Sequence, residues 1–206
     1  INLTKMGDEN LKAREVGRSL DLLERAMLVC RVNRIKSVEF PMTSVSGRRP
    51  KLLFLDMGLV QYINHISREI VESDNFSAIY KGGFAEQFVG QEFLPLTGSE
   101  RRPELFYWHR DEPRGTAEVD YVFPYKSCLL PVEVKAGHGS SLASLHQYIY
   151  QYKPPFAIRI YDGEFRFETI KTILSVPSRT EIEYKMLSLP FYLIHRLPDF
   201  CAKLCK

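Results

Sequence analysis

The stretch Ala117-Glu-Val-Asp-Tyr-Val-Phe-Pro-Tyr-Lys-Ser-Cys-Leu-Leu-Pro-Val-Glu-Val-Lys135 is the part of the chain around which the fold is organised. Two apolar-rich runs flank a short polar turn centred near Lys126, a pattern that predicts a β-hairpin. Alternate side chains of a strand share a face, so this turn places Asp120 opposite Glu133, with Lys135 two residues further on. Two carboxylates and an amine are expected to converge on one patch of the sheet.

These charged residues have a second interpretation. Polar side chains on one strand face are most often simply exposed to solvent, and Glu133 with Lys135 would then be an ordinary surface ion pair. The second strand is otherwise apolar, as a central strand would be. Charged residues in a central strand need a partner, a metal ion or a function. The residues alone leave both interpretations open.

Composition limits the class of protein. The 206 residues are 45% hydrophobic and 26% charged, as in a soluble globular protein. The net charge of +3 produces no overall basic field, so any surface for nucleic acid must be local. No apolar run approaches the ~20 residues that span a bilayer, and no partner membrane is expected. The chain opens on Ile1 without a signal peptide, which favours a cytoplasmic fragment of a longer protein.

Two structural units are expected along the chain. Residues 1–56 show a helical pattern, then a strand, a Ser-Gly-Arg-Arg turn and a second strand, which is typical of a winged helix. The arginines of this unit would suit a DNA backbone, or would simply keep a small domain soluble. Residues 57–206 alternate helical and strand patterns and are expected to form an α/β domain.

The charged residues of the hairpin resemble a known signature. Asp120, followed by Glu133-Val134-Lys135 on the adjacent strand, is similar to the motif of the PD-(D/E)XK nucleases, in the variant where Glu-Val-Asp replaces Pro-Asp. That family also carries an acidic residue on its first helix, and the segment Gly82-Gly-Phe-Ala-Glu-Gln-Phe-Val89 supplies one in Glu86. The resemblance implies a restriction-endonuclease-like mixed sheet flanked by helices.

A narrower resemblance covers most of the chain. The ordered motifs are similar to those of the uncharacterised module found C-terminal to the ATPase in a prokaryotic AAA+ family, which also has a winged helix at the place of residues 1–56. The motifs, in chain order, are Lys51 to Gly58, the Glu86 helix, Tyr107-Trp108, Glu118 to Asp120, Glu133 to Lys135, and Leu189 to Tyr192. The resemblance implies that an ATPase domain of the same polypeptide is a partner.

The resemblance also implies roles for the site residues. Glu86, Asp120, Glu133 and Lys135 would be catalytic, and Asp120, Glu133, Glu86 and the carbonyl of Val134 would hold Mg²⁺ or Mn²⁺. Carboxylates are the hard oxygen ligands that Mg²⁺ prefers, and the metal would activate a water molecule and stabilise charge on a phosphate. Lys135 would position that water and offset the developing negative charge.

Three further side chains are candidates for substrate binding. Arg110 and Arg114 border a charged loop close to the expected site and suit phosphate contacts. Gln147 lies on the helix predicted after the hairpin, where nuclease relatives often bear Gln or Lys.

Three functions therefore remain open. The first is metal-dependent hydrolysis of phosphodiester bonds in DNA. The second is a catalytically silent nuclease-fold module that docks nucleic acid or protein beside the ATPase. The third is a purely structural module that regulates the ATPase. The sequence indicates neither strand preference nor an oligomeric state.

Overall fold

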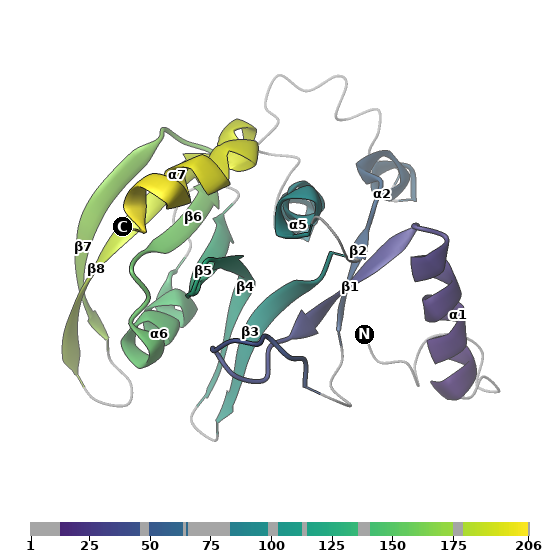
Figure 1. The fold of residues 1–206 in the computed structure, drawn as a ribbon, viewed down its shortest axis with the longest axis horizontal. Coiled ribbons are helices and arrows are strands. Elements are labelled where there is room, and N and C mark those ends of the chain that lie inside the picture. The colour runs from purple at the N-terminus through teal and green to yellow at the C-terminus, as the bar shows by residue number, and fades with distance from the viewer. Residues whose placement is uncertain are drawn as a thin grey trace.

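One mixed sheet connects most of the described chain (Figure 1). The structure is a computed structural model that describes residues 13–45, 50–63, 65, 83–98, 103–112, 115–135, 141–174 and 179–205. Its strands are β1 (Val29–Arg34), β2 (Lys51–Phe54), β3 (Leu105–Glu112), β4 (Gly115–Tyr125), β5 (Cys128–Lys135), β6 (Ala157–Tyr161), β7 (Arg166–Leu174) and β8 (Thr180–Pro190). Within these residues the sheet has eight strands in the order β2-β1-β3-β4-β5-β6-β8-β7. The pairs β1–β3, β5–β6 and β6–β8 are parallel and the others antiparallel.

Helices cover both faces of this sheet (Figure 1). They are α1 (Ala13–Arg25), α2 (Met57–Ile63), α5 (Gly83–Thr97), α6 (Ala143–Tyr152) and α7 (Leu197–Leu204), with a 3₁₀ helix, η2, at Phe191–Arg196. Side chains of α5, η2 and α7 share one buried apolar cluster with the sheet, and those of α6 share a second. The expected mixed α/β architecture with flanking helices is confirmed. None of the helices in the described ranges is long and apolar enough to cross a membrane.

The N-terminal segment differs from the prediction of a separate winged-helix-like unit over residues 1–56. A helix followed by an antiparallel strand pair is present as α1, β1 and β2. However, β1 also pairs in parallel with β3, with Val32 opposite Leu105, so both strands belong to the main sheet. Val32 and Leu53 are buried in the same cluster as α5. A domain boundary at residue 56 would therefore cut through the sheet, because the strands β2 and β1 at one end of it come from the N-terminal segment.

The β4–β5 hairpin forms as predicted. Lys126 lies in its turn with a positive φ of 52°. The ladder pairs Tyr125 with Cys128 and continues to Tyr121 opposite Val132. The next residues along this register are Asp120 and Glu133, as the alternation predicted.

A bulge in β4 changes the direction of Asp120. On the side of β3, Val122 pairs with Phe106 but Val119 pairs with Trp108, so β4 has one more residue than β3 over this interval. Val119 and Val122 both pack in the α6 cluster, whereas Tyr121 packs in the α5 cluster. The extra residue therefore lets Asp120 as well as Tyr121 turn toward α5, as bulges beside functional sites commonly do.

The bulge also corrects the expectation that Asp120 and Glu133 share one face. Val132 and Val134, the neighbours of Glu133, both pack in the α5 cluster. Strand alternation therefore directs Glu133 to the side of α6. The two carboxylates are neighbours around the end of the β4–β5 ladder rather than on a common face.

Gly90 of α5 accommodates the neighbouring strands. A Cβ atom at this position would meet Tyr121 Oη and would come within 2.6 Å of Leu53 Cδ1. Tyr121 Oη in turn donates a hydrogen bond to the carbonyl oxygen of Glu86 at 2.8 Å. The absence of a side chain at Gly90 therefore lets α5 lie close to β2 and β4.

Gly90→Ala tests this close approach. We expect it to lower the free energy of unfolding by roughly 1–3 kcal/mol through overpacking, although alanine favours a helix. The control is Gly17→Ala in α1, where a Cβ atom meets nothing within 4 Å and stability should be unchanged or higher. Urea unfolding measures both variants, and equal stability of the two would contradict the proposed contact.

Candidate functional site

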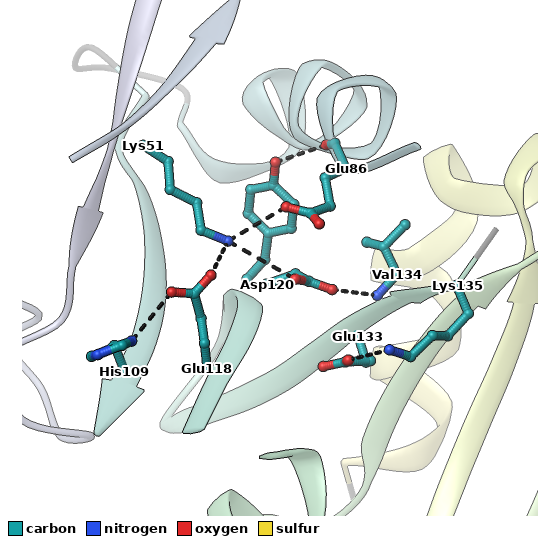
Figure 2. Close-up of polar contacts among 9 residues, drawn as sticks. Lys51, Glu86, His109, Glu118, Asp120, Glu133, Val134 and Lys135 are labelled. Carbon is teal, nitrogen blue, oxygen red and sulfur yellow. Dashed lines mark hydrogen bonds and ion pairs between the residues drawn. The ribbon is translucent and has the colours of Figure 1, made fainter. Parts of the chain in front are cut away.

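Lys51 of β2 lies at the centre of a group of carboxylates (Figure 2). Its Nζ atom is 2.7 Å from Glu118 Oε1, 3.5 Å from Glu86 Oε2 and 3.9 Å from Asp120 Oδ1. The same ammonium group is 5.2 Å from the centre of the Tyr107 ring. Burial alone would lower the pKa of Lys51, but the three carboxylates raise it above its usual value. Lys51 therefore stays charged and draws β2, β4 and α5 together.

Asp120 is buried between two groups of charges. Its side chain is 13% exposed, and its Oδ2 atom accepts a hydrogen bond of 2.8 Å from the Val134 backbone N–H. Burial, followed by the charges of Glu133 and Glu86, raises the pKa of Asp120 to about 7. The Val134 N–H and Lys51 act in the opposite direction. The carboxylate is thus held in place while its negative charge is incompletely compensated.

Glu133 pairs with Lys135 on the same strand. Its Oε1 atom is 2.6 Å from Lys135 Nζ. Its Oε2 atom is buried and has no hydrogen-bond partner among the described residues, although the residue is only 6% exposed. Burial raises the pKa of Glu133, Lys135 opposes this, and Glu86 adds to it. Buried carboxylate oxygens usually have a partner, so this atom is an exception that points to chemistry rather than stability.

His109 supports the group from β3. Its Nδ1 atom is 3.2 Å from Glu118 Oε2, while the other oxygen of Glu118 contacts Lys51. His109 therefore orients Glu118 toward Lys51, which agrees with a structural role for this histidine.

The charges of the site do not balance. Among the described residues, Lys51 and Lys135 are the lysines whose ammonium groups contact Glu86, Glu118, Asp120 and Glu133. Two positive charges thus face four carboxylates, which leaves two negative charges when all are ionised and His109 is neutral. As the side chains lie, the described residues contain no group of three His, Cys, Asp or Glu side chains that would hold a metal ion. The ammonium groups of Lys51 and Lys135, rather than further carboxylates, contact the carboxylate oxygen atoms.

The sequence-based candidates meet different outcomes. Glu86, Asp120, Glu133 and Lys135 lie in one electrostatic neighbourhood, since Glu133 and Glu86 raise the pKa of Asp120 and Lys135 opposes the rise in the pKa of Glu133. Arg110 lies on β3 opposite Ala117, and Gln147 is buried on α6. Arg114 lies outside the described residues. Lys51 and Glu118 were not predicted as site residues, and only the start of a motif at Lys51 pointed to that segment.

Part of this site lies in a segment that is similar to an uncharacterised family. Residues 81–179 match the model of a domain of unknown function, DUF4143. The matched segment includes Glu86, Asp120 and Glu133, whereas Lys51 precedes it. No curated protein and no solved structure matches the chain. The family match therefore agrees with the predicted uncharacterised module and assigns no activity.

The raised pKa of Asp120 predicts a pH-dependent stability. Between about pH 4 and pH 7 the folded state keeps a proton that the unfolded state has released, so the free energy of unfolding falls as the pH rises. Asp120→Asn removes this loss and keeps an oxygen for the Val134 N–H. We expect the variant to be more stable than the wild type at pH 8 by roughly 1–3 kcal/mol, with a smaller advantage at pH 5.

Urea unfolding in EDTA over a pH series measures this difference. Asp199→Asn, which removes a carboxylate from an exposed ion pair with Arg196, is the control. An Asp120→Asn effect that is constant from pH 5 to pH 8 would show that the carboxylate is not destabilised in the fold.

Proposed function

We propose that this chain is the nuclease-like part of a metal-dependent enzyme that hydrolyses phosphodiester bonds in DNA. The observation that carries the proposal is the buried pair of Asp120 and Glu133, both with raised pKa values, with Lys135 beside it. Strongly shifted carboxylates of this kind are concentrated at functional sites. A divalent cation would compensate the two excess negative charges of the site.

The donor chemistry suits Mg²⁺ or Mn²⁺. Glu133 Oε2 is a buried carboxylate oxygen without a hydrogen-bond partner, and Asp120 is a second hard oxygen donor next to it. Asp120, Glu133, the Val134 carbonyl and Glu86 are the groups that would hold the ion. When bound, such an ion lowers the pKa of a water molecule and stabilises charge on the phosphate.

The residues of the chain supply the remaining functions. The Val134 N–H fixes the orientation of Asp120. Lys51 keeps Glu86, Glu118 and Asp120 together and limits their repulsion. Lys135 Nζ, which is 2.6 Å from Glu133 Oε1, would orient the attacking water and offset charge on the phosphate.

A docking module is the second candidate function. Lys51 already lies between three carboxylates, so part of the site is neutralised without a metal ion. A site of this kind would retain the nuclease fold while serving as a platform beside the ATPase domain that the motifs imply. Both candidates are proposed for the cytoplasm, where the four free cysteines would stay reduced.

Metal-dependent melting and cleavage test the proposal together. Wild-type protein should melt at a higher temperature with Mn²⁺, since a ligand of the folded state at 100 times its Kd adds about 2.7 kcal/mol. Lys135→Ala should keep this stabilisation and lose cleavage of plasmid and single-stranded DNA. Asp120→Ala should lose both. Lys171→Ala, which removes an exposed lysine paired with Glu183, is the control and should lose neither.

Two outcomes would contradict hydrolysis at this site. Stabilisation by Mn²⁺ that persists in Asp120→Ala would place the ion elsewhere. A wild-type protein that neither binds Mn²⁺ nor cuts DNA, also when joined to its ATPase, would favour the docking module.

A further inference from the structure

A polar row crosses three neighbouring strands of the sheet beside the candidate site. Glu133 of β5 is in register with Arg159 of β6, and Arg159 is in register with Ser188 of β8. Residues in register on adjacent strands share a face. Because Ile158, Ile160, Leu187 and Leu189 pack in the α5 cluster, the row between them is directed to the side of α6.

The row lies close to the carboxyl ends of parallel strands. β5, β6 and β8 run in the same direction and end at residues 135, 161 and 190. In open α/β sheets, ligands bind at this edge. The position of the row is therefore one at which a substrate would approach Glu133.

Three polar atoms of the row are buried and have no hydrogen-bond partner within the part of the chain that the structure describes. They are Glu133 Oε2, Arg159 Nε and Ser188 Oγ. Ser188 is 0% exposed, and Glu133 is 6% exposed. More than nine in ten buried polar groups are bonded in folded proteins, so three exceptions on one row call for a specific reason. Two donors beside a carboxylate would suit a ligand that carries anionic oxygens.

The guanidinium group of Arg159 is held in one orientation by Tyr161, and it can still bind an anion. Its guanidinium carbon lies 4.4 Å from the centre of the Tyr161 ring, a contact that holds the planar group over the aromatic face. Its ion-pair partner is Glu168, with 3.9 Å between Arg159 Nη2 and Glu168 Oε1, which exceeds hydrogen-bond length. A guanidinium held flat in this way presents its N–H groups to the oxygen atoms of a phosphate.

We propose that Arg159, with Ser188 beside it, binds a phosphate of the DNA backbone next to the bond that is cut at Glu133. The proposal rests on the function proposed above and adds a substrate-binding residue on the neighbouring strand, about 4.8 Å from β5. The adjacent positive charge compensates for the negative site that a DNA strand has to approach. Arg159 thereby takes the role that the sequence suggested for Arg110 and Arg114.

Fluorescence anisotropy with a labelled DNA oligonucleotide tests the row. Arg159→Gln should weaken binding roughly 10-fold and reduce the slope of log affinity against log salt by about 1. The matched control is Arg166→Gln. Arg166 lies on β7, in register with Ser188 of β8. Its side chain is 57% exposed and is paired with Glu164. It loses the same charge, and binding should change less than about twofold.

Two further variants separate binding from stability. Glu168→Gln removes the carboxylate that competes for Arg159 and should strengthen binding about twofold. Ser188→Ala should weaken binding while the melting temperature stays the same or rises, because a buried hydroxyl without a partner is lost. A purely structural Arg159–Glu168 pair would instead lower the melting temperature in both Arg159→Gln and Glu168→Gln and leave binding unchanged.

The outcomes keep the two proposals distinct. Equal binding by Arg159→Gln and Arg166→Gln would overturn the phosphate site, even if the wild type cuts DNA. Loss of binding in Arg159→Gln alone would support the site, even if no cleavage is found with Mg²⁺ or Mn²⁺. If Arg159→Gln melts below the assay temperature, Arg159→Lys replaces it, and it should bind more weakly than the wild type because it keeps the charge without the planar fork.

Discussion

The extra residue in β4 determines how the two sides of the molecule meet. Without it, strict alternation would direct Asp120 and Glu133 to one face and Tyr121 to the other. With it, Asp120 and Tyr121 both turn toward α5. The Tyr121 hydroxyl then binds the Glu86 carbonyl, while Asp120 reaches Lys51 and the Val134 N–H. The bulge in β4 thus connects the strand to α5, links the end of the β4–β5 ladder through the Val134 N–H, and positions the carboxylate of Asp120.

The cost of this arrangement is electrostatic. Burying several carboxylates is unfavourable unless each has a partner, and Lys51 and Lys135 provide only part of the compensation. Replacing such a group by apolar side chains is often neutral or stabilising. Stability alone therefore does not account for the cluster, and the elevated pKa of Asp120 is better explained by a task that needs a concentrated negative charge.

Much of the hairpin was predictable because its signals are local. Alternation and a polar turn define the β4–β5 register. The bulge was not predictable, since one extra residue leaves no mark in an apolar pattern. Lys51 was missed for another reason: it lies 35 residues before Glu86, and the parallel β1–β3 pairing that brings its strand pair into the sheet is non-local. Arg159 was missed because a single arginine inside an apolar strand resembles no motif.

Charged groups lie on both faces of the sheet, and the end of the β4–β5 ladder lies between the two groups. On the side of α5, Lys51 is surrounded by carboxylates; on the side of α6, Arg159 lies between Glu133 and Ser188. Asp120 and Glu133 stand at the boundary, where the ladder between β4 and β5 ends at Tyr121 and Val132. The segment that matches the uncharacterised family contains this boundary but neither Lys51 nor Ser188. Since these residues come from β2 and β8, which lie outside the match, the site belongs to the whole sheet, and an explanation of its chemistry has to include strands from both ends of the chain.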